Sequence, residues 1–153
     1  MKRRGLLIGA LLALAACATA PTELANPHQA FNSNRISVVT RGSGADVILI
    51  PGLSSSRDVW NTTADALDDN YRVHLVQLNG FAGAPVGANG EGLVSAPVAE
   101  EIARYIRENN LQRPAVIGHS MGGSIGMMLA ARHPDSVGTL MVVDMFPFMG
   151  NMF

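Results

Sequence analysis

A serine stands between two glycines in the stretch Gly118-His119-Ser120-Met121-Gly122, which matches the pattern Gly-x-Ser-x-Gly. A serine hydroxyl held in this way can act as a nucleophile in acyl transfer when a base takes its proton. The glycines allow a tight turn that projects the hydroxyl. A helix that starts directly after the turn would point N–H groups and its positive dipole end at a nearby oxyanion. Ser120 is therefore the candidate nucleophile.

The residues on both sides of the pattern have the character that such a turn requires. Residues 114–120 form a short apolar run that indicates a buried strand, and residues 121–134 are predicted to form a helix. His119 belongs to the turn itself, and Gly123 adds to the glycines that support it. A strand before the serine and a helix after it are the context in which this pattern has mechanical meaning.

Strand and helix patterns alternate along the rest of the chain. The predicted strands are residues 35–42, 46–52, 71–80, 114–120 and 137–148, and the predicted helices are residues 57–69, 96–110 and 121–134. The strands are almost continuously apolar, which is typical of parallel strands covered on both faces. The helix at 96–110 places Val98, Ile102 and Ile106 on one face. The predicted fold class is α/β, a mostly parallel sheet with helices on both faces.

Together, these elements resemble the N-terminal half of an α/β-hydrolase fold protein over about residues 36–148. Pro51-Gly52 occupies the place where His-Gly is common in the oxyanion loop of that family. The resemblance implies an oxyanion hole formed by the backbone amides of Leu53 and Met121, since the N–H groups and not the side chains do the work there.

A serine at the nucleophile position separates the chain from some relatives of that fold. Epoxide hydrolases and haloalkane dehalogenases of this fold use aspartate, so Ser120 points to acyl transfer. We expect a small-molecule ester or related acyl substrate, with carboxylic esters first and thioesters, amides or peptides close behind. No cofactor or metal is expected, because one Cys and scattered His residues provide no ligand cluster.

The sequence offers no clear general base for Ser120. The chain has four histidines, and none is expected within hydrogen-bond reach of Ser120. His74 is expected about 20 Å from the serine, and His133 about 18 Å away at the far end of the following helix. His119 should project to the other side of the turn, and His28 precedes the domain. The base is therefore missing from the predicted site.

The acid of a catalytic triad is less clearly marked. Asp144 stands near the end of the strand that follows the nucleophile helix, at the edge where ligands bind in open α/β sheets. Two interpretations are open, a catalytic acid or a structural, pocket-lining aspartate, because most members of the resembled family place the acid one strand later.

The sequence stops on apolar residues where the resembled family would continue toward its histidine. We therefore expect a fold truncated after the strand that follows the nucleophile helix, and a 153-residue chain that is inactive alone. Its last strand would be an uncovered apolar edge, which favours weak stability or aggregation. The alternative function is a non-catalytic binding lipoprotein that keeps the hydrolase scaffold.

The N-terminus has the features of a targeting segment. Residues 1–16 combine a basic start with an apolar run and are predicted to be a signal peptide. The run ends in a lipobox-like sequence before Cys17, the only cysteine, which predicts lipid attachment and membrane anchoring there. Residues 17–34 would be a tether and residues 35–153 the hydrolase-like domain. The expected location is the bacterial cell envelope, lipid-anchored on the periplasmic face.

An ordinary secretory signal, cut near Ala18-Thr19-Ala20, is the alternative and would give a soluble secreted or periplasmic protein. Either cut removes three basic residues. Counted from Cys17, the chain has eight basic and twelve acidic residues and a net charge of −4. A protein of this charge is a poor nucleic-acid partner.

Overall fold

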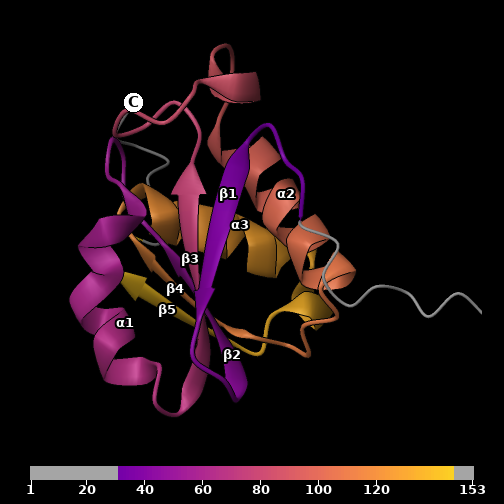
Figure 1. Ribbon diagram of the computed structural model, residues 1–153. Coiled ribbons are helices and arrows are strands. Elements are labelled where there is room, and N and C mark those ends of the chain that lie inside the picture. The colour runs from indigo at the N-terminus through magenta and orange to yellow at the C-terminus, as the bar shows by residue number, and fades with distance from the viewer. Residues whose placement is uncertain (1–30, 147–153) are drawn as a thin grey trace, which may run out of the picture.

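The computed structural model describes residues 31–146, in which five strands and three α-helices alternate (Figure 1). The predicted order of elements is observed. The elements are β1 (Ile36–Arg41), β2 (Ala45–Ile50), α1 (Asn61–Leu67), β3 (Tyr71–Leu78), α2 (Ser95–Glu108), β4 (Ala115–His119), α3 (Met121–Arg132) and β5 (Thr139–Val143). Short 3-10 turns lie at Arg57–Trp60 (η1), Gly87–Asn89 (η2) and Pro134–Ser136 (η3).

Three predicted strands run past their observed ends by two residues or more, by two residues at β2 and β3 and by five residues at β5. The strand predicted over residues 71–80 ends at Leu78, because Gly80 takes a φ of 88° and starts a turn. The strand predicted over residues 137–148 ends at Val143, because Asp144 has a φ of 52° that interrupts the extended backbone. Both interruptions of the extended backbone occur at the edge of the sheet where the functional residues are expected.

The strands form one mixed sheet in the order β1-β3-β2-β4-β5. β1 pairs antiparallel with β3, whereas β3, β2, β4 and β5 run parallel to one another. The predicted mostly parallel α/β sheet is confirmed. The register pairs Ile50 of β2 with Gly118 of β4, and His119 of β4 with Val143 of β5. The carboxyl ends of these three strands therefore meet at one edge.

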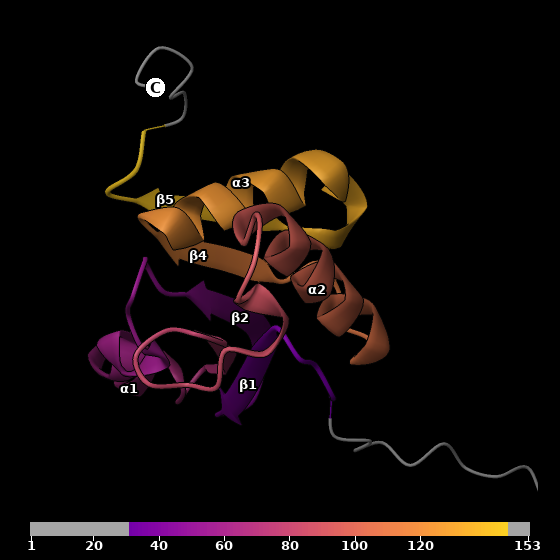
Figure 2. The same cartoon turned by 90° about the horizontal axis from the view of Figure 1, so that it is seen from above.

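Helices cover both faces of the sheet, as predicted. Figure 2 shows α2 and α3 on one side and α1 on the other. The predicted apolar stripe of α2 is buried, with Val98, Ile102 and Ile106 at most 3% exposed in the larger core. Ala64 of α1 packs in a second, smaller core against β2 and β3. Burial of these stripes is the main force that fixes the layers.

Phe31 and Asn32, predicted as part of the tether, contact α2. The ring of Phe31 meets the ring of Tyr105 edge-on at 5.0 Å, and the Arg104 guanidinium lies 4.4 Å over the Phe31 ring. Arg104 also donates a 2.8 Å hydrogen bond to the carbonyl oxygen of Asn32. These contacts extend the folded unit to Phe31. The predicted signal peptide at residues 1–16, and Cys17, lie outside the described residues.

Within residues 31–146, none of the helices has the length and apolar character needed to cross a membrane.

Candidate active site

Ser120 occupies a strained turn between β4 and α3. Its φ of 51° and ψ of −120° are rare for a residue with a side chain and cost on the order of 1–3 kcal/mol. Hydrogen bonds hold the turn from both sides. The Ser120 amide donates to the carbonyl oxygen of Val143 at 2.9 Å, and the Ser120 carbonyl oxygen accepts from the Gly123 and Ser124 amides at 2.8 and 3.2 Å. The predicted strand, turn and helix are thus observed at these residues.

The glycines around Ser120 are required by close backbone contacts. A Cβ atom on Gly118 would overlap the carbonyl oxygen of Gly122, and one on Gly122 would lie 2.6 Å from the carbonyl oxygen of Pro51. A Cβ atom on Gly123 would lie 2.9 Å from a methyl carbon of Val142. Side chains at these positions would push the first turn of α3 away from β2, β4 and β5. The three glycines therefore allow the helix to begin directly against the sheet.

The loop after β2 runs beside this turn. Gly52 is buried, and a Cβ atom on it would lie 2.9 Å from Nδ1 of His119 and 3.4 Å from Cβ of Ser120. Leu53 comes next, and its side chain is exposed. The amides of Leu53 and Met121 thus belong to the two segments that flank Ser120. Neither amide donates a backbone hydrogen bond within residues 31–146.

The side chain of His119 lies beside a pocket. Val59, Trp60, His119 and Val143 line a space of about 250 Å³ at this edge of the sheet. The sequence predicts Trp60 only as an apolar residue of a helix. No pattern in the sequence indicates that it lines a pocket. Its indole Nε1 is buried and has no hydrogen-bond partner among the residues that the structure describes.

Asp144 lies at the end of β5, close to this pocket. Its Oδ2 is 3.8 Å from Nε2 of His119, which is too long for a hydrogen bond. The carboxylate is almost fully exposed, while the His119 side chain is 40% exposed. The structure therefore brings Asp144 near His119, the residue before Ser120. Among residues 31–146, no hydrogen bond joins the side chain of Asp144 or His119 to the Ser120 hydroxyl.

The other histidines have partners elsewhere. Both ring nitrogens of His74 are occupied, Nδ1 by the hydroxyl of Tyr105 at 2.7 Å and Nε2 by Oδ1 of Asp46 at 2.9 Å. His133 contacts Oε2 of Glu100 at 2.7 Å near the C-terminal end of α3. His28 lies outside the described residues. Within the described part of the chain, no histidine is in place to take the proton of Ser120.

The position of His74 differs from the sequence-based expectation. His74 lies four residues before the end of β3, not six, because the strand ends at Leu78. Through Ile48 it is in register with Val116, four residues before Ser120. This offset is about 13 Å along the strands, and the two strand spacings of about 10 Å lie at right angles to it, so His74 is about 16 Å from Ser120. The separation is shorter than the expected value of about 20 Å but still far beyond hydrogen-bond reach.

Burial and hydrogen bonding shift the pKa values of the His74 network. Burial lowers the pKa of His74, although its hydrogen bond to Asp46 acts in the opposite direction. For Asp46, burial raises the pKa of the carboxyl, but hydrogen bonds from Arg72 and His74 outweigh it and the net pKa is lowered. His74 is therefore held as a neutral donor to a carboxylate, inside the sheet and away from Ser120.

The described residues contain no group of three or more His, Cys, Asp or Glu side chains that could hold a metal ion.

Comparison with known proteins places the chain among hydrolases of one fold. Residues 47–151 match the family described as alpha/beta hydrolase fold. A pimeloyl-[acyl-carrier protein] methyl ester esterase of Aeromonas hydrophila subsp. hydrophila is 36% identical over 113 residues, which are 73% of this chain and 42% of that protein. A fluoroacetate dehalogenase of Burkholderia sp. is 33% identical over 115 residues, 73% of this chain and 38% of that protein.

A solved structure, an esterase of a marine microorganism, superposes with a TM-score of 0.64 at 33% identity. The match covers 72% of this chain and 41% of the esterase. The chain thus spans about two fifths of the length of the proteins it resembles.

Proposed function

The chain belongs to the alpha/beta hydrolase fold family, and we propose that it carries the nucleophile of a serine hydrolase acting on carboxylic esters or related acyl substrates. The observation that carries the proposal is the strained backbone of Ser120, held between a strand and a helix beside the Gly52 loop. Such strain persists only where surrounding contacts maintain it, and it is concentrated at functional sites.

The proposed reaction begins with attack of Ser120 Oγ on the carbonyl carbon of the substrate, while a base takes the hydroxyl proton. The carbonyl oxygen becomes an oxyanion and accepts hydrogen bonds from the Leu53 and Met121 amides. When the tetrahedral intermediate collapses, the alcohol leaves with a proton from the base, and the acyl group stays on Ser120. Water then attacks this acyl-enzyme, releasing the acid and restoring the serine.

The identity of the nucleophile supports ester chemistry over halide displacement. The chain is similar to both an esterase and a dehalogenase, so overall similarity does not choose between them. Haloalkane dehalogenases of this fold use an aspartate nucleophile, and position 120 is a serine. A serine alkoxide attacking a carbonyl carbon is the chemistry that this side chain performs.

The base must come from outside residues 31–146, because no histidine in that range reaches Ser120. Asp144 remains the candidate acid, and its position at the carboxyl edge of the sheet, 3.8 Å from His119, supports a place in or beside the site. The same missing base favours the second candidate function, a non-catalytic binding protein that retains the turn.

A lipid anchor at Cys17 completes the proposal. It rests on the sequence alone, because Cys17 lies outside the described residues. The anchor would hold the protein at the periplasmic face of a bacterial membrane, and a soluble secreted or periplasmic protein is the alternative.

Each proposal has its own test. Covalent labelling by a fluorophosphonate, compared with Ser120→Ala, tests the catalytic proposal. Metabolic labelling with a fatty acid, compared with Cys17→Ser, tests the anchor.

A further inference from the structure

Gln77 is a buried polar side chain at the carboxyl end of β3, 7% exposed. We propose that Gln77 is a positioning residue that holds the loop of residues 51–56, and with it the Leu53 amide, in place beside Ser120. The inference rests on the proposed function, because it concerns the loop that would supply one of the two oxyanion donors.

The side-chain amide of Gln77 links two loops. Its Oε1 accepts a hydrogen bond from the Arg57 amide at 2.9 Å. Its Nε2 donates to the carbonyl oxygens of Leu78 at 3.0 Å and Phe81 at 3.2 Å. One side of the group therefore holds the start of η1, and the other holds the turn after β3. All three contacts are to backbone atoms, so they fix the course of the chain.

The loop of residues 51–56 depends on its two ends. At its start, the carbonyl oxygen of Pro51 and the backbone of Gly52 pack against Gly122 and His119. At its end, the Arg57 amide is bound by Gln77. Between these anchors, the loop's own backbone hydrogen bond runs from the Ser55 amide to the Gly52 carbonyl oxygen at 3.2 Å. The Leu53 amide lies within the turn that this hydrogen bond closes.

Because the Gln77 side chain is buried, loss of its hydrogen bonds would cost free energy. A buried amide that loses its partners costs about 1–3 kcal/mol, so Gln77 strongly favours the loop position that satisfies it. The Arg57 side chain adds a separate anchor, donating to the Leu75 carbonyl oxygen at 3.4 Å and to the Ser37 hydroxyl. That anchor holds the Arg57 side chain, whereas Gln77 holds the backbone that leads into the loop.

A positional shift of the Leu53 amide would matter for catalysis. Donors of an oxyanion hole act at 2.7–3.1 Å from the developing charge, and a displacement of about 1 Å can cost about 100-fold in rate. The effect should fall on the chemical step, because the side chain of Gln77 is buried behind the loop and does not line the pocket beside His119.

Hydrogen exchange by mass spectrometry or NMR on the full chain tests the loop directly. Gln77→Met fills the same volume without hydrogen bonds and should speed exchange of the Ser55 amide at least tenfold, although Ser55 does not contact Gln77. It should also speed exchange of the Ala84 amide, which donates to the Phe81 carbonyl oxygen. Gln77→Glu keeps an acceptor for Arg57 but no donor, so it should restore Ser55 protection and leave Ala84 exchange fast.

Asn89→Ala is the matched control. Asn89 is a second bridging amide at this edge of the sheet, donating to the carbonyl oxygens of Arg35 at 2.8 Å and Asn79 at 3.0 Å. Its loss should leave Ser55 exchange unchanged. Unchanged Ser55 exchange in Gln77→Met would overturn the inference, and so would faster exchange spread evenly over all strands. If Gln77→Glu does not fold, the comparison of Gln77→Met with Asn89→Ala decides the question.

The rate of fluorophosphonate labelling at saturating probe gives the catalytic readout. Gln77→Met should lower this rate about 10- to 100-fold, with the half-saturating probe concentration unchanged. A fall in probe affinity at an unchanged maximal rate would contradict a positioning role. This readout uses a product long enough to include the base. If that product is not labelled at all, the proposed function fails, while the exchange experiment on the 153-residue chain still shows whether Gln77 holds the loop.

Discussion

The amide of Ser120 donates a 2.9 Å hydrogen bond to the carbonyl oxygen of Val143. This bond joins the residue after β4 to the last residue of β5, and it holds Ser120 at a φ of 51°. The strained turn is thus fixed by the neighbouring strand as well as by the helix that follows it. Its geometry belongs to the fold and does not depend on a bound substrate.

Because of the strained backbone at Ser120, we expect a glycine variant to be more stable than an alanine variant. Ser120→Gly should raise the free energy of unfolding relative to Ser120→Ala by about 1 kcal/mol, because glycine accepts a positive φ without a Cβ clash. Urea denaturation of both variants measures the difference. Equal stability of the two variants would show that the backbone at position 120 is relaxed.

Gly122 should tolerate no side chain. Gly122→Ala would place a Cβ atom 2.6 Å from the carbonyl oxygen of Pro51 and still closer to that of Ile50. We expect it to lower the free energy of unfolding by about 2 kcal/mol or more. The control is Gly92→Ala, where φ is 72° but no atom lies within 4 Å, so the loss should be about 1 kcal/mol. Similar losses at both positions would argue against the close contact of α3 with β2.

Local patterns predicted much of this site. The glycines around Ser120, the apolar run before it and the helix after it are all encoded within a few residues, and so is the stripe of Val98, Ile102 and Ile106. The turn and the α2 packing were predictable for this reason. The roles of Ser120, Leu53, Met121 and Asp144 in catalysis remain predictions.

Long-range partners could not be predicted. Gln77 reads as one polar residue in an apolar strand, and its acceptor role is revealed only when the Arg57 amide, twenty residues earlier, is brought beside it. Similarly, β1 pairs with β3 and not with the adjacent β2, which no local pattern indicates. The end of β5 was placed too late because the apolar run continues past Asp144, where the backbone turns.

Acid should destabilise the protein in two steps. Because burial lowers the pKa of His74 in the folded state, the unfolded chain binds the proton more readily, and the free energy of unfolding should fall as pH drops below about 6.5. Asp46 has a lowered pKa despite the opposing effect of burial, so its stabilising contribution is present above about pH 4 and is lost as pH falls further.

His74→Gln isolates the first step. It should flatten the dependence of unfolding free energy on pH between about 7 and 5, while the step below about pH 4 remains. Chemical denaturation at a series of pH values gives the curve, and His133→Gln, which replaces the histidine at the C-terminal end of α3, is the substitution control. An unchanged slope in His74→Gln would contradict the assignment.

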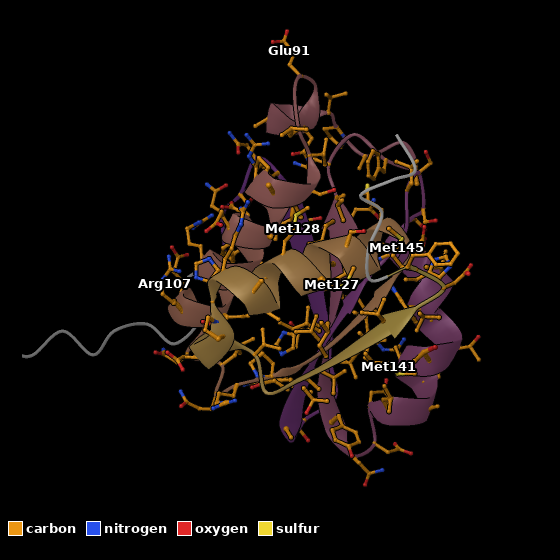
Figure 3. The ribbon with its side chains drawn as sticks, turned by 180° about the vertical axis from the view of Figure 1, so that it is seen from behind. Glu91, Arg107, Met127, Met128, Met141 and Met145 are labelled. Atoms are coloured by element: carbon orange, nitrogen blue, oxygen red, sulfur yellow. The ribbon has the colours of Figure 1, made fainter. Side chains whose placement is uncertain are left out.

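The outer edge of β5 should promote self-association. Met141 on this strand (Figure 3) is 56% exposed, and among residues 31–146 no strand pairs with the outer side of β5. Met141→Lys should reduce concentration-dependent association in sedimentation velocity, because charge protects an open strand edge. Leu93→Lys, at an 81% exposed position in the loop before α2, is the control. A monomeric parent protein with a sharp, cooperative melt would rule out the prediction.

The most direct test is fluorophosphonate labelling followed by peptide mass spectrometry. It is carried out on this chain and, where the reading frame continues, on the longer product, each beside its Ser120→Ala variant. A single adduct on Ser120 of the longer product, absent from Ser120→Ala and slow or absent in the 153-residue chain, is the predicted result. Labelling that persists in Ser120→Ala, or no labelling of any folded form, would contradict Ser120 as an activated nucleophile and favour the binding protein.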